Sequence, residues 1–192
     1  MKKIVIIASG PSLTQEQVDY CKDKADVMVI NDNYKLAPWA DWLYACDFDW
    51  WGHHYKDIRK SFSGELWTQD ERAIDAFANI NIIEGTHKRG LGKDGIIHFG
   101  QNSGYQAINL AYLWGYTEII LIGYDMKLDY TGRRHWFGDH PQPLDKKANY
   151  DKWISNFQGL ALDLEEEGIK VYNCTTSTAL DCFEIEKLEN VL

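Results

Sequence analysis

Short runs of apolar residues recur along the chain and alternate with stretches of mixed polarity. A continuous apolar run without polar alternation is typical of a parallel strand that is buried on both faces. The first run, Lys3 to Ala8, is rich in Ile and Val and is broken by Ser9-Gly10-Pro11-Ser12. The pattern predicts strands over residues 3–8, 26–31, 42–46, 81–84, 117–122 and 169–172.

Capping residues and helical spacing predict helices between these strands. Thr14 followed by Gln17 is a capping box, and we expect its helix to run through about Lys24. Ser103 is suited to cap a helix over about 104–114, and Gly115 stands at the usual stop position. Further helices are expected over 70–77, over 145–167 and in the tail from 179. This alternation predicts one α/β domain over residues 1–192, with a Rossmann-like open, mainly parallel sheet and helices on both faces.

Two connections stand out from this rhythm. Residues 86–95 contain three glycines and are basic, which predicts a mobile loop. Residues 123–144 form a long connection without a helical or strand pattern, and loops of that length often act as active-site lids. We therefore expect a lid at 123–144.

Composition narrows the function classes. The 192 residues include 20 Lys and Arg against 29 Asp and Glu, a net charge of −9. That charge argues against general binding to nucleic acid or to an anionic membrane. No apolar run approaches a membrane span, and the four cysteines lack C-x-x-C spacing, so we expect buried, reduced thiols in a cytoplasmic protein. The oligomeric state is left open.

Small polar residues follow almost every predicted strand. In open α/β sheets, ligands bind beyond the carboxyl ends of the strands. Each group alone is typical of turn or cap chemistry, but together they predict a rim that binds a polar ligand. These groups are Ser9–Ser12, Asn31–Asn33, Asp47–Asp49, Asn102–Gly104, Gly123–Asp125 and Asn173–Ser177.

Gly10-Pro11-Ser12 leads into a helix whose free N–H groups would attract a phosphate or carboxylate. It matches neither the dinucleotide fingerprint nor the P-loop, so a plain turn is the alternative. Asp47 and Asp49 either hold Mg²⁺ or Mn²⁺ against a diphosphate or cap the segment that follows.

The long connection carries two histidines, His135 and His140, in the run HWFGDH. A histidine in a loop over a cleft can act as a general base or acid, although surface decoration is the alternative. Arg133 and Arg134 precede the run and could neutralise a leaving phosphate. The pairs His53-His54 and Lys88-Arg89 are expected on the solvated surface.

Taken in order, these motifs resemble a known superfamily. They are a strand with G-P-S-L, a strand ending in Asn, N-S-G opening a helix, G-Y-T-E-I-I-L-I-G-Y-D, H-W-F-G-D-H and I-K-V-Y-N-C. The set is similar to the bacterial sialyltransferases of the Campylobacter type. It is also similar to the Rossmann-like group named after the archaeal hydroxymethylpterin diphosphokinase, which includes many prophage proteins. The similarity spans about residues 4–180, with 51–100 unmatched.

The resemblance implies site residues. Gly10, Pro11, Ser12 and Asn31 would hold a cytidine nucleotide, and Asn102, Ser103, Gly104 and Asp125 would also face it. Lys127 and Tyr130 stand near the position of a phosphate-binding tyrosine, and Trp136 replaces a second one. His140, or else His135, would be the base, while Lys127, Tyr130 or Arg134 would meet the leaving phosphate.

The lead hypothesis is a nucleotide-dependent transferase, most similar to a glycosyltransferase that uses a nucleotide-activated sugar and needs no metal. The alternative is a Mg-dependent diphosphokinase acting on a small alcohol, with Asp47, Asp49 and Asp125 as metal ligands. A third hypothesis is a non-catalytic nucleotide-binding protein. The expected partner is therefore a nucleotide or a nucleotide-sugar.

Overall fold

The computed structural model describes residues 2–145 and 147–192. Eight strands form one sheet in the order β10-β9-β8-β1-β2-β3-β4-β5, and every pair in it is parallel. The strands are β1 (Lys3–Ile7), β2 (Asp26–Ile30), β3 (Trp42–Tyr44), β4 (Glu65–Thr68), β5 (Ile80–Ile82), β8 (Glu118–Ile122), β9 (Lys170–Asn173) and β10 (Glu184–Ile185). A separate parallel pair joins β6 (Glu84–Thr86) to β7 (Ile96–His98).

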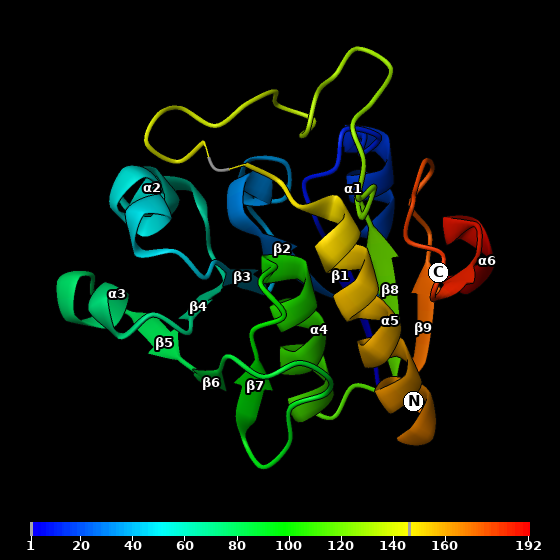
Figure 1. The fold of residues 1–192 in the computed structure, drawn as a ribbon. Helices are drawn as coiled ribbons and strands as arrows, with labels where there is room; N and C mark the ends of the chain where they lie inside the picture. Colours follow the sequence, from blue (N-terminus) through cyan, green and yellow to red (C-terminus); the bar gives the residue numbers. More distant parts are fainter. Residues whose placement is uncertain (1, 146) are drawn as a thin grey trace.

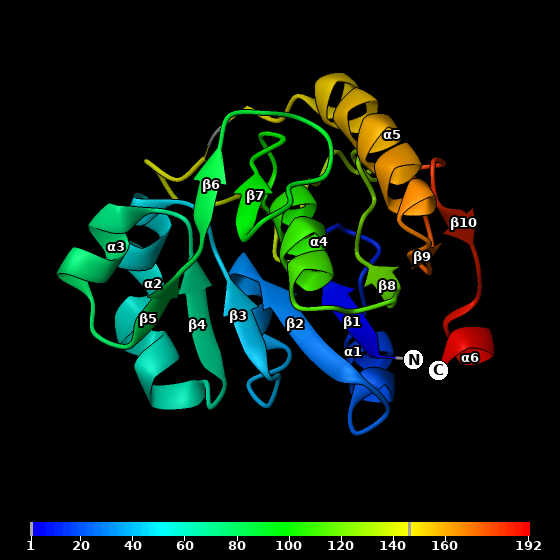
Figure 2. The same ribbon diagram turned by 90° about the horizontal axis from the view of Figure 1, so that it is seen from below.

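Helices cover both faces of this sheet, as the sequence predicts. On one face lie α4 (Ser103–Leu113) and α5 (Tyr150–Glu166). The other face carries α1 (Gln15–Cys21), the 3-10 helix η1 (Asn31–Lys35), α2 (Phe48–Ser61), α3 (Glu71–Ala76) and α6 (Leu188–Val191). Figure 2 shows α4 and α5 on one side of the strands and α1 and α6 on the other. The fold is thus an α/β, Rossmann-like open sheet.

Alternate residues of β1 pack into the two hydrophobic cores, one on each face of the sheet. Ile4 and Ile6 pack with α4 and α5, whereas Val5 and Ile7 pack with α1 and α2, and all four are fully buried. A strand covered on both faces has no polar side to show, which explains its unbroken apolar run.

Local signals placed several helix ends correctly. Thr14 and Gln17 form both halves of the predicted capping box at the start of α1. Gly115 follows α4 with a φ of +77°, the left-handed conformation that favours glycine at a helix end.

Other boundaries were wrong. Helix α1 ends at Cys21, before Lys24, and Asp23 has a left-handed φ of 62°. Asn102, and not Ser103, caps α4, because its side chain accepts a hydrogen bond from the backbone N–H of Tyr105. Helix α5 begins at Tyr150 instead of residue 145, and only Leu188–Val191 of the tail is helical.

Three elements within residues 47–100 were not predicted at all: α2 (Phe48–Ser61), β4 (Glu65–Thr68) and β7 (Ile96–His98). Where one strand was expected over 81–84, the structure has the end of β5 and the start of β6. Thr86, the first residue of the predicted Gly-rich loop over 86–95, is instead the last residue of β6.

The four cysteines are free thiols, of which Cys21 and Cys174 are buried and Cys46 and Cys182 are partly buried. Burial raises the pKa of Cys21, Cys174 and Cys182 to about 12. In the part of the chain that the structure describes, no helix combines the length and apolar character that a membrane span requires.

The sheet changes direction at its centre. From β1 the chain moves outward through β2, β3, β4 and β5, and it later returns to add β8, β9 and β10 on the other side of β1. The point between β1 and β8 is a topological switch, where the crevice of an open α/β sheet lies. The long connection from β8 to α5 arches over this carboxyl edge (Figure 1).

Candidate functional site

A cavity of about 960 Å³ opens at the carboxyl edge of the sheet. It brings together residues from the ends of β1, β2, β3, β4 and β8, the N-terminus of α4 and the long connection. Most of the residues predicted for the site line it: Gly10, Asn31, Asp47, Asn102, Ser103, Gly104, Asp125, Lys127, Arg134, His135 and His140. Their convergence follows from parallel strands ending at one edge.

The floor of the cavity lies at the switch between β1 and β8. The backbone N–H of Gly10 donates to the carbonyl oxygen of Gly123 at 2.8 Å, and the N–H of Ser12 donates to Oδ2 of Asp125 at 2.9 Å. A Cβ on Gly10 would lie 1.9 Å from Oδ1 of Asp125 and 2.5 Å from the Gly123 carbonyl oxygen. Only glycine permits this close approach of the two strand ends.

Asp125 is the buried carboxylate of this floor. Its Oδ1 is buried and has no hydrogen-bond partner among the described residues. Burial raises the pKa of the Asp125 carboxyl, and hydrogen bonding to Ser12 opposes the shift. A buried oxygen without a partner is costly unless a ligand or water satisfies it, so Asp125 is suited to bind a hydroxyl of a ligand.

The N-terminus of α4 forms one wall. Ser103 and Gly104 line the cavity, and the first turn of α4 contains no acidic residue. The positive end of the helix dipole therefore has no local carboxylate to offset it, which favours an anion. The Ser103 hydroxyl lies 3.0 Å from the thiol of Cys46.

The long connection is fastened over the cavity by Trp136. Its indole N–H donates to Oδ1 of the fully buried Asn33 at 2.7 Å, and its backbone N–H donates to the Ser9 carbonyl oxygen at 3.2 Å. Asn33 in turn donates to the carbonyl oxygen of Ile7. Trp136, which stands at the position of a phosphate-binding tyrosine in the resemblance, packs toward η1 and does not line the cavity.

This fastening holds His135 and His140 at the cavity, with their rings 4.9 Å apart. Burial lowers the pKa of His135 to about 4, and the neighbouring charge of His140 adds to the shift. Burial also lowers the pKa of His140, against the opposing pull of Asp32. Both imidazoles are therefore neutral at pH 7 and able to accept a proton.

Two cations reach the cavity from the same connection. Lys127 lies within 3.4 Å of the carbonyl oxygen of Thr178, and Arg134 forms ion pairs with Asp139 at 2.9 Å and with Asp145. An anionic ligand would have to draw Arg134 away from these carboxylates.

Five of the candidate residues lie outside the cavity, and one of them, Arg133, pairs with Asp129 at 2.8 Å instead. Pro11 and Ser12 do not line it, and the N-terminus of the short helix α1 is satisfied by the Thr14 capping box instead of standing free for a phosphate. Tyr130 is 98% exposed, and Asp49 lies on an exposed face of α2.

The hypothesis that Asp47 and Asp49 together bind a metal ion is not supported by their positions at the start of a helix. Asp47 is the N-cap residue of α2 and Asp49 lies in its first turn, so the two side chains do not share one strand face. Within the described ranges, no three histidine, cysteine or carboxylate side chains gather closely enough to hold a metal ion.

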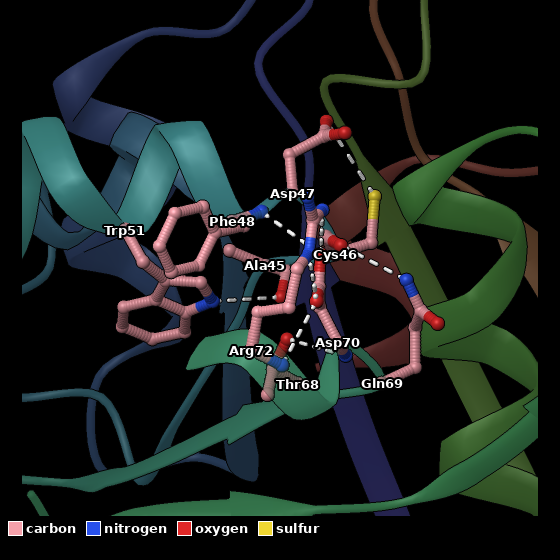
Figure 3. Close-up of polar contacts among 9 residues, drawn as sticks. All are labelled: Ala45, Cys46, Asp47, Phe48, Trp51, Thr68, Gln69, Asp70 and Arg72. Atoms are coloured by element: carbon pink, nitrogen blue, oxygen red, sulfur yellow. Dashed lines mark hydrogen bonds and ion pairs between the residues drawn. The ribbon is translucent and has the colours of Figure 1, made fainter. Parts of the chain in front are cut away.

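Figure 3 shows polar groups at the ends of β3 and β4 that, apart from Asp47, were not predicted from the sequence. Asp70 caps α3, pairs with Arg72 at 2.6 Å and accepts the backbone N–H of Phe48. Gln69 donates to the carbonyl oxygen of Cys46 at 2.9 Å. The cavity is lined here by Gln69, Asp70, Glu71, Arg72 and Glu84.

A second group lies beneath the histidines, in which only Asp32, as part of the rim segment Asn31–Asn33, was predicted. Asp32, 2% exposed, receives hydrogen bonds from Trp50 at 2.9 Å and Lys35 at 2.6 Å. His54 stacks on Trp50 and is only 5% exposed, so the expectation of a solvated His54 was wrong. The spacing of Trp50, His54 and Ile58 on one helix face was the signal that could have placed it in the core.

Comparisons of the chain with models of protein families, with curated proteins and with solved structures find no match. The geometry of the cavity is therefore the ground on which a function can be assigned.

Proposed function

We propose that this protein is a nucleotide-dependent transferase, most similar to a glycosyltransferase that takes its sugar from a nucleotide. The observation that carries the proposal is the single cavity at the β1–β8 switch, in which Asn31 and Asp125 lie with His140 of the long connection. An open parallel sheet binds nucleotides at this place, and the cavity has the volume of a small-molecule site.

The nucleoside would bind against the strand ends. Asn31, which has a left-handed φ of 51°, and the pair Asn102 and Ser103 offer amide and hydroxyl groups for a base and ribose. The unpartnered Oδ1 of Asp125 would accept a hydrogen bond from a ribose hydroxyl. By its resemblance to the sialyltransferases, the chain is expected to prefer cytidine.

The phosphate would lie at the N-terminus of α4. The helix dipole, Lys127 and a released Arg134 would stabilise the charge that develops on the departing nucleotide.

His140 would act as general base, with His135 as the second choice. The acceptor hydroxyl gives its proton to Nε2 of His140 while its oxygen forms a bond to the anomeric carbon of the sugar. The bond from that carbon to the phosphate oxygen breaks, and the nucleotide leaves with the electron pair. General-base catalysis of this kind contributes about 10²–10⁴-fold.

Calorimetry with CMP, CDP, ATP and GTP, each with and without Mg²⁺, tests the proposal. Cytidine nucleotide binding without metal, together with turnover of an activated sugar, supports it. In the His140→Ala variant, turnover should fall by about 10²-fold or more while nucleotide affinity stays within about threefold. His53→Ala is the matched control, because His53 is exposed on α2 and does not line the cavity. Equal loss of binding and turnover in His140→Ala contradicts the role.

The diphosphokinase alternative is favoured by the placement of Asp47 and Asp125 in the same cavity. Mg²⁺ commonly uses only one or two carboxylates together with substrate phosphates. Strictly Mg-dependent binding of ATP would select this alternative, and tight nucleotide binding without turnover would select a non-catalytic binding protein.

A further inference from the structure

Asp32 is a buried carboxylate at the end of β2, in the first turn of η1. Its Oδ2 is held by Lys35 and its Oδ1 by the indole N–H of Trp50. Burial opposes the charge of Asp32, but the hydrogen bonds from Lys35 and Trp50 outweigh it and lower the pKa of the carboxyl. Asp32 is therefore a fixed negative charge below the cavity.

The imidazole of His140 faces this charge. Its Nδ1 lies 3.8 Å from Oδ1 of Asp32 and is buried without a hydrogen-bond partner among the described residues. A movement of roughly 1 Å would bring the two atoms to hydrogen-bond length. Because His140 lies on the long connection and Asp32 on η1, a small movement of that connection toward η1 would close the gap.

His54 approaches the same oxygen from α2. Its Nε2 lies 3.5 Å from Oδ1 of Asp32, and its Nδ1 lies 3.2 Å from the Tyr34 hydroxyl. Burial lowers the pKa of His54 to about 4, so His54 is neutral at pH 7 and brings no competing cation. Trp50 occupies one lone pair of the oxygen, and His54 and His140 share access to the other.

We propose that Asp32 is the positioning residue for His140: it accepts a hydrogen bond from Nδ1–H and thereby points the unprotonated Nε2 into the cavity. A carboxylate in this position fixes the tautomer and ring orientation of a histidine base and stabilises the imidazolium that forms. The role as base rests on the proposed function, whereas the pairing itself does not.

Nuclear magnetic resonance of the full-length protein with ¹⁵N-labelled histidine tests the pairing without any substrate. Long-range ¹H–¹⁵N couplings should show His140 protonated on Nδ1 in the wild type. In Asp32→Asn, the amide N–H₂ can donate to Nδ1, so the proton should move to Nε2. Asp57→Asn, on an exposed part of α2, should leave the tautomer unchanged. An Nε2–H tautomer in the wild type, or the same tautomer in Asp32→Asn, overturns the proposal.

A second variant guards against unfolding of Asp32→Asn. The side chain of Lys35 is 44% exposed, so Lys35→Met should fold. The variant removes the ammonium group that pairs with the Asp32 carboxylate. The charged groups that face His140 are Asp32, Lys35, Arg134 and Asp145, with His54 and His135 beside them. Removal of one cation should raise the pKa of His140, and an unchanged or lowered pKa contradicts the pairing.

Activity separates this inference from the function on which it rests. Once a donor is turned over, Asp32→Asn should lower kcat by about 10²-fold or more with the KM for the nucleotide unchanged. A normal kcat in Asp32→Asn sinks the inference and leaves the transferase intact. The expected tautomers without turnover of any donor would instead sink the proposed function and leave the pairing in place.

Discussion

We predict that the hydrogen bond from Trp136 to Asn33 holds the long connection in place over the cavity. Substituting Trp136→Phe keeps an aromatic ring against the core around η1 and removes the indole N–H that donates to Asn33 Oδ1 at 2.7 Å. Asn33 cannot follow the change, because its Nδ2 is tied to the carbonyl oxygen of Ile7 at 2.8 Å and its side chain is fully buried.

The magnitude follows from the orphaned oxygen. A buried acceptor left without its partner costs about 1–3 kcal/mol, more than the roughly 1 kcal/mol net value of an ordinary hydrogen bond. The smaller ring loses part of its packing as well. The connection can limit this cost by opening and admitting water to Asn33, so we expect a loss of unfolding free energy of about 1–3 kcal/mol together with greater opening.

Urea denaturation gives the first quantity, and hydrogen exchange of the backbone amides over 123–144 gives the second. Trp39→Phe is the matched control, since Trp39 is half-buried against the same core and its indole donates no hydrogen bond to any described residue. A Trp136→Phe protein as stable as the wild type, with unchanged exchange over the connection, would refute the reasoning.

Two further predictions concern stability. Gly10→Ala should cost about 1–3 kcal/mol in urea denaturation, because its Cβ would lie 1.9 Å from Oδ1 of Asp125, whereas Gly52→Ala meets nothing within 4 Å in a helix and should gain about 0.5–1 kcal/mol; equal effects would contradict the close approach. The pKa of His54 is lowered to about 4 by burial, so the unfolded chain binds more protons between pH 4 and 6.5 and stability should fall as the pH drops through this window, by about 2 kcal/mol at pH 5. His54→Gln should lose that part of the pH dependence, exposed His53→Gln should keep it, and the parts due to His135 and His140 should remain in both. An undiminished pH dependence in His54→Gln would contradict the prediction.

The central sheet was predictable because a strand buried on both faces is a continuous apolar run, which can be recognised without knowing what packs against it. Runs such as 3–8 and 117–122 are apolar at nearly every position, and the chain order of these runs then fixes an α/β fold. The strands that escaped prediction are β4, β7 and β10, with four, three and two residues, at or near the periphery of the fold. Strands this short contain too few residues to show the alternation of apolar and polar positions by which a strand is recognised.

Helix α2 escaped for a different reason. Its core-facing positions are Trp50, Trp51, His54 and Ile58, and one of these is a polar side chain that becomes acceptable only because Trp50 stacks on it and Asp32 lies nearby. Those partners come from η1 and from α2 itself, and their meeting depends on tertiary packing. The same dependence hid the contacts of Asp32 with Trp50 and His54, whereas the position of Asn31–Asn33 at a strand end could be predicted from the sheet alone.

Charge is unevenly distributed across the cavity, and this decides how a ligand would lie in it. Lys127 of the long connection and the N-terminus of α4 line one part of the cavity, while Asp70, Glu71 and Glu84 line it near the ends of β4 and β5. A phosphate near Asp70, Glu71 and Glu84 would face three carboxylates and Arg72, whose guanidinium is already paired with Asp70, on a chain whose net charge is −9. Under the proposed function, the phosphate of the nucleotide would therefore lie toward α4 and Lys127, and the carboxylates at the other end would accept hydrogen bonds from the hydroxyls of an acceptor. His140 projects from the connection that spans these two ends, which is where a proton must leave the acceptor for the transferase chemistry to proceed.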